Sequence, residues 1–321
     1  MTELTQGALL GSSTNRLERP SKISMLVRLL RVPEWAKNGF VFAPLMFGGR
    51  LLSLESCWRV LLVSLALCAV SSCVYIVNDI LDAPRDREHP VKRHRPLAAG
   101  LVAPAAAYAI VAGLLVVGFM LLRADRAPVS VLVMTAGFLM LNAVYSLYLK
   151  RKVIVDVLTI AIGYVLRVLI GGALIGVAVT HWLLLCTFLL ATFLGFSKRR
   201  HELMMLGADS KRTRPVLGFY TEEFLDRLSM LTLAMTLTCY MLYTIAPPTI
   251  ETFGTDALVY SSLIVMFALF RYLFLVHVKK MGSPVEVLYY DRQIVFAIVC
   301  WLLYMVVVVY AWPALNQVIA R

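Results

Sequence analysis

Long apolar stretches make up most of this chain, and this feature limits what it can fold into. A helix that crosses a bilayer needs roughly 20 apolar residues. Nine segments approach that length, at residues 35–52, 58–77, 101–122, 129–149, 153–177, 182–196, 228–246, 257–276 and 294–312. Because 60% of the residues are hydrophobic and only 16% are charged, a soluble enzyme, a disordered chain and a fibrous protein are excluded. We therefore expect an all-α protein, a polytopic membrane bundle of nine transmembrane helices.

The distribution of Lys and Arg predicts how these helices are oriented. Most of the 31 basic residues fall in the N-terminal segment and in alternate connections, at 81–100, 150–152, 198–227 and 271–292. The remaining connections and the C-terminus hold only Arg50, Arg59, Arg123, Arg126 and Arg321. By the positive-inside rule the N-terminus is cytoplasmic and the C-terminus lies outside. The net charge of +12 then reports orientation, and no nucleic-acid partner is needed to explain it.

The chain divides into a tail and one membrane domain. Residues 1–33 begin with a polar stretch that lacks the apolar core of a signal peptide, so no cleavage is expected. We expect a cytoplasmic N-terminal tail at 1–33, disordered over residues 1–20, and a single transmembrane domain at 34–321. The sequence is compatible with a homo-oligomer.

Three aspartates end the second apolar segment. Asp79, Asp82 and Asp86 are three and then four residues apart, so a helix places them on one face. Their repulsion costs free energy unless a cation offsets it, and Mg²⁺ takes one or two carboxylates together with waters and phosphate oxygens. Asn78 can orient a ligand or donate to a phosphate. We interpret the cluster as a magnesium–diphosphate site. The alternative is an ordinary solvated helix end, and Pro84 would disturb the helix so that Asp86 lies on a turn.

Basic residues follow the aspartates directly. Arg87, Lys92 and Arg95 suit a polyphosphate substrate, because they offset charge that a metal leaves uncompensated. The alternative is that they only orient the protein in the membrane. His89 and His94 are expected to be loop residues rather than metal ligands.

A second polar group joins the fourth and fifth segments. Tyr145 and Lys150 end the fourth segment, and Asp156 begins the fifth. On one helix Asp156 and Arg167 differ by about 20° in direction and by about 16 Å in depth. An arginine inside a bundle needs an anion or carbonyl groups. We expect Arg167 to bind a phosphate or an anionic lipid head, or alternatively to hold two helices together.

Weaker candidates lie elsewhere. Lys37 and Asn38 fall one turn into the first segment, where Lys37 alternatively extends to the membrane interface. Lys198 and Arg199 begin a loop that is expected to cover the site. Tyr220 is expected at the surface.

The aspartate cluster resembles the first motif of the UbiA superfamily of intramembrane prenyltransferases. The pattern N-D-x-x-D-x-x-x-D-R begins at Asn78, H-P-x-K-x-x-R-P begins at His89, and Gly100 follows. Aromatic prenyltransferases of this superfamily usually carry a second D-x-x-x-D cluster. Here Asp156 stands alone, because Lys152 occupies the position four residues earlier.

This sparser second motif is similar to that of the decaprenyl-phosphate phosphoribosyltransferase branch. W-x-K-N from Trp35, K-R-x-x-E-L from Lys198 and the polar stretch at 282–292 also look like that branch. The resemblance implies transfer of 5-phosphoribose from phosphoribosyl pyrophosphate to a polyprenyl (decaprenyl) phosphate, releasing pyrophosphate. The lipid product, polyprenylphosphoryl-5-phosphoribose, would be a precursor for cell-envelope polysaccharide.

The resemblance also implies roles for the residues. Mg²⁺ would be held by the three aspartates, and Asp156 would orient a substrate hydroxyl or a lysine. The cations expected to gather the two anionic substrates are Lys92, Arg95, Lys150 and Arg167. The prenyl tail would lie along the apolar wall of the bundle. The expected location is the bacterial cytoplasmic membrane, with the site facing the cytoplasm.

Two other functions remain open on the sequence. An aromatic prenyltransferase of quinone or haem biosynthesis shares the fold, the metal and the first motif, but its lipid is a prenyl diphosphate donor. A transporter is disfavoured, because transporters place such charges near the midplane of the membrane and on broken helices.

Overall fold

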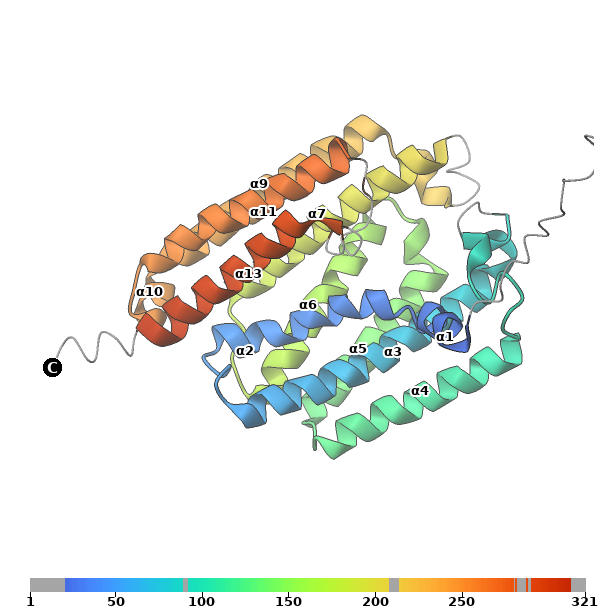
Figure 1. Cartoon of the computed structure of the whole chain (residues 1–321), viewed down its shortest axis with the longest axis horizontal. Coiled ribbons are helices and arrows are strands. Elements are labelled where there is room, and N and C mark those ends of the chain that lie inside the picture. The colour runs from blue at the N-terminus through green and yellow to red at the C-terminus, as the bar shows by residue number, and fades with distance from the viewer. Residues whose placement is uncertain are drawn as a thin grey trace, which may run out of the picture.

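The computed structural model describes residues 21–88, 92–207, 214–279, 281, 287 and 290–312, and these residues form helices without any strand. Eight of the helices in this part of the chain are long and apolar enough to cross a membrane. Their α-helical parts are α3 (Leu54–Asp86), α4 (Pro104–Ala124), α5 (Val129–Leu147), α6 (Val155–Ile175), α7 (His181–Leu206), α9 (Glu222–Ile245), α11 (Ser261–His277) and α13 (Arg292–Val306). Figure 1 shows them as a bundle along one common direction.

Shorter elements connect or extend these helices. The short α-helices are α1 (Lys22–Leu30), α2 (Ala43–Phe47) and α10 (Pro247–Phe253). The 3₁₀ helices are η1 (Val32–Phe42), η2 (Lys92–His94), η3 (Leu149–Arg151), η5 (Pro215–Phe219) and η6 (Ala257–Tyr260). A π-helical turn, η7 (Val307–Ala311), continues α13.

The first of the nine predicted spans is wrong as a single α-helix. Residues 35–52 instead continue η1 into α2 and a turn at Gly48 and Gly49. Pro44 has no backbone N–H to donate. It is tolerated in the first turn of α2, whereas it would disrupt the interior of one continuous α-helix over residues 35–52. Because a 3₁₀ helix rises about 2 Å per residue, η1 and α2 together extend about 30 Å. The segment therefore reaches about as far as a membrane helix, although nine such helices are not confirmed.

Two helices continue further than predicted. Helix α3 includes Pro84 and ends at Asp86, so all three aspartates lie on one helix. The proline cannot donate to the carbonyl of Ile80 and its ring crowds that group, yet the helix continues two residues beyond it. Helix α7 continues to Leu206, so the expected loop beginning at Lys198 is helical. An ion pair between Arg199 and Glu202, three residues apart and 2.8 Å long, supports this extra turn.

The N-terminal segment is ordered where it is described. Residues 1–20, where disorder was predicted, lie outside the described part of the chain, and residues 22–30 of the predicted cytoplasmic tail form α1. Leu29 is buried against Ile76 and Leu97, whereas Ile23 and Leu26 are exposed. This packing fixes the end of α1 beside the last turns of α3.

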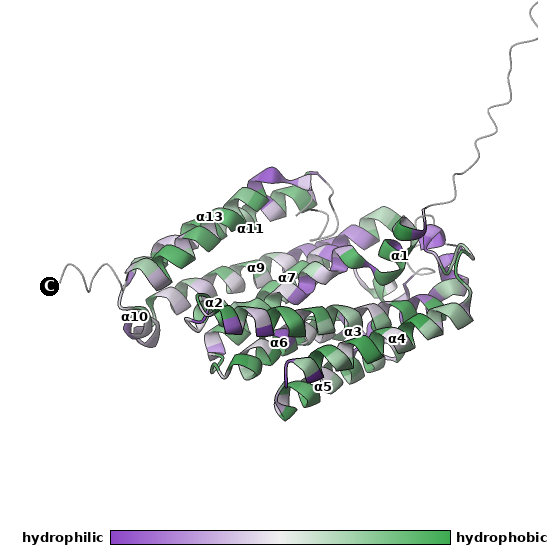
Figure 2. Ribbon diagram, turned by 60° about the horizontal axis from the view of Figure 1, so that its bottom comes forward, coloured by the Kyte–Doolittle hydropathy of each residue, from purple (hydrophilic) through white to green (hydrophobic). Residues whose placement is uncertain are grey.

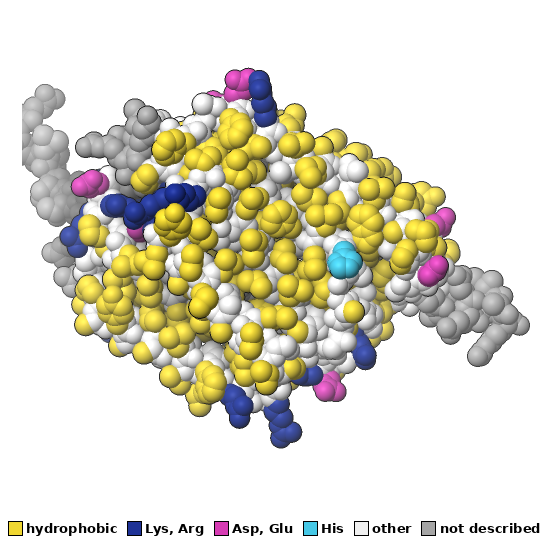
Figure 3. Space-filling model, turned by 180° about the vertical axis from the view of Figure 1, so that it is seen from behind, with side chains coloured by type: hydrophobic (Ala, Val, Ile, Leu, Met, Phe, Trp, Pro, Cys, Tyr) yellow, Lys and Arg dark blue, Asp and Glu magenta, His cyan; other side chains and the backbone are white. Residues whose placement is uncertain are grey.

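The outer surface of the bundle suits contact with lipid. Helices α4 and α5 leave most of their apolar residues exposed. Figure 2 shows hydrophobic residues along most turns of the long helices. Hydrophobic side chains cover most of the face drawn in Figure 3, and charged side chains lie towards its edges. Together with the eight apolar helices, these surfaces indicate an integral membrane protein, whereas the direction of insertion stays a prediction.

Helix α6 lies at the centre of the fold and packs against α7, α5, η1, α3 and α2. Glycines allow this close packing. A Cβ atom added at Gly171 would lie 2.1 Å from the carbonyl oxygen of Val41 in η1, and one at Gly195 in α7 would lie 2.6 Å from Val157 in α6. The small residues thus set how deeply η1 enters the bundle.

We expect Gly171→Ala to lower the melting temperature of the detergent-purified protein. The new methyl group meets backbone rather than a flexible side chain, and overpacking of this kind costs about 1–3 kcal/mol. Gly113→Ala on α4 is the matched control, because no atom lies within 4 Å of the added Cβ. Alanine favours a helix, so the control should keep or raise the melting temperature. Equal melting temperatures for the two variants would contradict this packing.

Candidate active site

A polar cavity of about 300 Å³ lies at the end of the bundle where α3 ends and α6 begins, which we call the site end. Its wall comes from α3, α5, α6 and α7 and from the segments around η2, η3 and η5. Most of the predicted site residues line it, namely Lys37, Asn78, Asp79, Asp82, Asp86, Lys92, Arg95, Tyr145, Lys150, Arg167, Lys198 and Arg199. The tertiary structure therefore gathers residues from five predicted segments into one cavity.

Each aspartate of the first cluster is paired with a cation. Arg95 Nη1 donates to Asp79 Oδ1 at 3.0 Å and to Asp86 Oδ2 at 2.6 Å. Lys150 Nζ lies 3.1 Å from both carboxylate oxygens of Asp82. The side chains of Asp79 and Asp86 are almost completely buried, whereas that of Asp82 is about one-third exposed at 32%. The carboxylates are thus neutralised by residues of the chain itself.

The donor set fits Mg²⁺ at the position now held by an arginine. Within the described residues no group of three carboxylate, histidine or cysteine side chains is arranged to hold a metal ion. Asp79 and Asp86 nevertheless converge on a single cationic atom, Arg95 Nη1. Two carboxylates aimed at one positive charge are the hard oxygen ligands that Mg²⁺ prefers. A metal could bind there only if Arg95 moved aside.

Arg31 is a site residue that the sequence did not single out. It ends α1 in the left-handed conformation, with φ of 51°. Its guanidinium donates to Asp79 and lies over the ring of Tyr75, 5.0 Å from the centroid. The sequence offered no signal beyond its positive charge, because the contact joins two segments that lie far apart along the chain.

Asp156 is completely buried and does not line the cavity. It accepts a hydrogen bond from Arg199 Nε at 2.7 Å and from the hydroxyl of Tyr220 at 3.0 Å. Arg214 Nη2 lies 3.5 Å away. Arg199 and Arg214 line the cavity, whereas Asp156 contacts them from outside it. Asp156 is therefore a positioning residue for these two guanidinium groups.

Tyr220 was expected at the surface, and this prediction was wrong. Its side chain is buried, and besides donating to Asp156 its hydroxyl accepts from the backbone N–H of Ile154 at 2.6 Å. Burial and the neighbouring carboxylate raise the pKa of Tyr220, so the phenol stays protonated and donates. The backbone N–H it caps belongs to a residue with φ of 66°, a conformation that sequence patterns do not reveal.

Tyr145 and Glu202 complete this second cluster. Arg214 Nη2 donates to the hydroxyl of Tyr145 at 2.8 Å, and Arg199 Nη1 donates to Glu202 Oε2 at 2.8 Å. Arg214 was also missed by the sequence analysis, since it lies in a charged connection that only the fold brings back to the cavity. The second cluster thus presents fixed guanidinium groups, with its own carboxylates already engaged.

Arg167 lies deeper in the cavity. Its Nε donates to Asn38 Oδ1 at 2.7 Å, and its Nη1 donates to the carbonyl of Gly163 at 2.8 Å. The guanidinium faces the rings of Phe138 and Tyr164, with 4.5 Å and 5.4 Å to their centroids. Asn38 does not line the cavity, so it acts by orienting Arg167.

The remaining predicted site residues also fall into two groups, those that line the cavity and those that do not. Lys37 and Lys92 line it. Lys37 pairs with Glu34, and burial lowers the pKa of Lys92. Arg87 does not line the cavity, because its Nε donates to the carbonyl of Ala98 at 3.3 Å. Its role in this structure is to hold the connection after α3. His89 lies outside the described residues.

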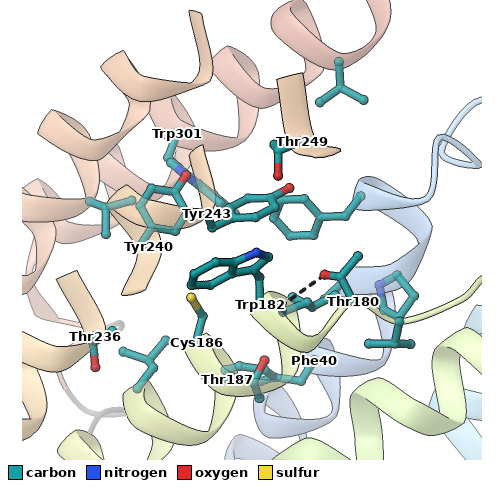
Figure 4. A pocket seen from close by; sticks show the side chains of 18 of the residues that line it. Phe40, Thr180, Trp182, Cys186, Thr187, Thr236, Tyr240, Tyr243, Thr249 and Trp301 are labelled. Atoms are coloured by element: carbon teal, nitrogen blue, oxygen red, sulfur yellow. Dashed lines mark hydrogen bonds between the residues drawn. The ribbon is translucent and has the colours of Figure 1, made fainter. Parts of the chain in front are cut away.

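A second, apolar cavity of about 830 Å³ occupies the other half of the bundle, and we call it the chamber. Figure 4 shows Trp182, Tyr240, Tyr243 and Trp301 around it. Tyr240 is held by Trp301, whose Nε1 donates to its hydroxyl at 2.9 Å. Leu194 of α7 lines both the chamber and the polar cavity, so this side chain lies between the two spaces.

These features define a class of protein, a helical membrane enzyme with a charged site next to a space for an apolar chain. The chain belongs to the UbiA prenyltransferase family, whose model matches residues 40–290. It is similar to the decaprenyl-phosphate phosphoribosyltransferases of Mycolicibacterium smegmatis and Corynebacterium glutamicum. The first is 28% identical over 87% of this chain and 91% of the relative. The second is 26% identical over 93% of this chain and 91% of the relative.

The fold matches that of a solved structure. A UbiA homologue from Archaeoglobus fulgidus, bound to DMAPP and Mg²⁺, superimposes with a TM-score of 0.67 over 89% of this chain and 99% of that chain. At 19% identity this similarity establishes the fold, and it confirms the UbiA-like helical bundle that the resemblance predicted, without confirming nine spans.

Arg95→Gln is expected to increase the affinity of the substrate-free protein for Mn²⁺, used as a paramagnetic probe for Mg²⁺, by several fold. The guanidinium competes with a metal for Asp79 and Asp86, and its removal leaves two buried carboxylates without a shared cation. Mn²⁺ binding is measured by electron paramagnetic resonance. The control is Arg93→Gln, an exposed neighbour that contacts His94. Unchanged or weaker Mn²⁺ binding in Arg95→Gln would contradict the assignment of the metal position.

Proposed function

We propose that this protein transfers 5-phosphoribose from phosphoribosyl pyrophosphate to a polyprenyl phosphate such as decaprenyl phosphate, in an Mg²⁺-dependent reaction. The products are polyprenylphosphoryl-5-phosphoribose and pyrophosphate. The observation that carries this proposal is the composition of the cavity. One carboxylate cluster is available to a metal there, and the place of a second cluster is taken by guanidinium groups held on Asp156.

This composition suits two anionic substrates. When bound, Mg²⁺ supplies positive charge to the leaving pyrophosphate. The donor also carries a phosphate on its ribose, and a guanidinium pair held rigidly, such as Arg199 and Arg214, binds a phosphate without a second metal. Asp156, together with Tyr220 and Glu202, keeps that pair in place.

The chemistry needs little else from the chain. Loss of pyrophosphate leaves positive charge on the anomeric carbon, as in glycosyl transfer. The attacking oxygen belongs to a phosphate that is already ionised, so no general base is required. What the residues must do is hold two negative groups close together, and the cations at the site end serve this purpose.

The chamber suits the lipid. It is bordered by aromatic and aliphatic side chains, and Leu194 lies between it and the polar cavity. A polyprenyl phosphate would extend its tail along the chamber and present its head to the cavity. The predicted orientation puts the site end in the cytoplasm of a bacterium, and the product would serve the synthesis of cell-envelope polysaccharide.

An aromatic prenyltransferase is the second candidate, because the solved homologue from Archaeoglobus fulgidus binds the prenyl diphosphate DMAPP with Mg²⁺. The engagement of Asp156 by Arg199, Arg214 and Tyr220 disfavours it, since a second metal would find no free carboxylate oxygen there.

A direct assay separates the two functions. Purified protein is incubated with Mg²⁺, radiolabelled phosphoribosyl pyrophosphate and decaprenyl phosphate, and parallel reactions contain a prenyl diphosphate and an aromatic acid. Labelled lipid in the first reaction supports the proposal, and product only in the second refutes it.

Asp79→Asn and Asp82→Asn are each expected to lower turnover by at least about a hundredfold, because each removes a charged oxygen ligand from the first cluster. Turnover is measured as label transferred to lipid. Glu223→Gln is the control, since this exposed residue pairs with Arg227 on the surface of α9, away from the cavity. Near-normal turnover in either aspartate variant, with a folded protein, would refute the role of the cluster.

Removal of divalent metal is expected to abolish turnover, and added Mg²⁺ is expected to restore it. The reason is that Asp79, Asp82 and Asp86 would offer oxygen ligands to a hard cation, which would neutralise charge on the leaving pyrophosphate. The measurement is label transfer after treatment with EDTA and then with Mg²⁺ in excess. Full turnover in EDTA would contradict this expectation.

A further inference from the structure

Arg167 is a buried cation without a carboxylate partner in the described part of the chain. Its side chain contacts an amide oxygen and a backbone carbonyl, both neutral. Arg95 and Arg199 in the same cavity differ in this respect, because each pairs with aspartate. A charge removed from water in this way costs several kcal/mol unless an anion offsets it. The described residues therefore provide no counter-ion for the positive charge of Arg167.

The guanidinium has hydrogen-bonding capacity left for a ligand. Nε and Nη1 bind Asn38 and Gly163, and Nη2 has no partner among the described residues. Arg167 lines the polar cavity, so Nη2 can donate to a ligand that binds in this cavity. The guanidinium also lies over the rings of Phe138 and Tyr164, and these contacts help to hold it in place.

The position of Arg167 points to an amphiphile. Tyr164, one turn before it on α6, lines the polar cavity, and its ring contacts Phe40 edge-on at 4.8 Å between centroids. Phe40 in turn lines the apolar chamber. Arg167 therefore lies near the boundary between the polar cavity and the chamber. Its Cα also lies about 16 Å beyond that of Asp156 along α6, away from the mouth of the cavity.

We propose that Arg167 is the receptor for the phosphate of the acceptor lipid, oriented by Asn38. This inference rests on the proposed function and deepens it by assigning one cation to one substrate. A phosphate monoester on a long apolar chain matches a single positive charge at the edge of an apolar space. The ribose phosphate of the donor has the same chemistry, but it is attached to a soluble molecule and has the cations of the site end available.

The test compares the binding of radiolabelled decaprenyl phosphate with that of decaprenol, the uncharged alcohol, to detergent-purified protein. Arg167→Gln is expected to weaken binding of decaprenyl phosphate by about tenfold or more, the cost of a charge-assisted hydrogen bond. Binding of decaprenol should not change. Binding of phosphoribosyl pyrophosphate with Mg²⁺, measured by calorimetry, should also stay as in the wild type.

Asn38→Asp provides a second variant that keeps Arg167 in place. The aspartate has the size of asparagine and still accepts from Arg167, but it adds the missing negative charge and gives up the bond that Asn38 Nδ2 donates to Cys68 Sγ at 3.2 Å. A thiol is a weak acceptor, so the variant should fold, which its melting temperature checks, and should lose the preference for phosphate over alcohol. If Asn38 and Arg167 only join η1 to α6, the preference should survive this change.

The matched control is Arg59→Gln. Arg59 pairs with Asp125 at the other end of α3, with Nε 3.2 Å from Oδ1, and its loss should leave the lipid preference unchanged. Wild-type affinity for decaprenyl phosphate in folded Arg167→Gln would overturn the inference. So would weaker binding of phosphoribosyl pyrophosphate with unchanged lipid binding, which would assign Arg167 to the donor. If Arg167→Gln does not fold, a retained preference in Asn38→Asp overturns the inference.

Failure of the proposed function gives a different result. In that case the wild type makes no labelled lipid from phosphoribosyl pyrophosphate. The Arg167 inference is then decided by the phosphate-over-alcohol preference alone, which needs no turnover.

Discussion

Carboxylates inside a membrane bundle require cations, and this requirement organises the site end of the protein. Asp79, Asp86 and Asp156 are almost completely buried, and each receives at least one arginine. The attraction between opposite charges is strong in a medium of low dielectric constant, but it must offset the cost of removing both from water. The arginines come from α1, from the connection after α3, from α7 and from the segment before η5. Charge neutralisation therefore ties connections far apart in sequence to the ends of α3 and α6.

The same ion pairs suit the site to its proposed substrates. A pyrophosphate with its metal can exchange partners with the existing pairs, because it brings both negative charge for the arginines and positive charge for the aspartates. Few charged groups are then left without a partner of opposite charge at any stage of binding. The second cluster is more rigid, since Asp156 is enclosed by Arg199, Arg214 and Tyr220. We infer that it acts as a fixed positive surface, whereas the first cluster rearranges.

Packing around α6 decides how deep the polar cavity extends. Close approach of η1 at Gly171 brings Asn38 to the guanidinium of Arg167. Without that approach Arg167 would lose the acceptor of its Nε and would face apolar side chains. The irregular η1 is therefore more than a substitute for a membrane helix, because it carries a polar group to the boundary between the cavity and the chamber.

Hydrophobic length and charge pattern were enough to predict eight of the membrane helices, and the resemblance of the first motif identified the family. Twelve of the predicted site residues line the polar cavity. Apolar periods and the spacing of Asp79, Asp82 and Asp86 are local properties, and a helix converts them directly into a span and a face. Contacts between distant segments leave no such local pattern. The sequence by itself therefore determined that this is a helical membrane protein of the UbiA family with an aspartate cluster at one end. Only the tertiary structure decided that Arg31, Arg214 and Tyr220 belong to the site, that Asp156 acts from behind it, and that Arg167 has no counter-ion among the described residues. The physical reason is that partners of buried charges are chosen by packing in space, not by distance along the chain.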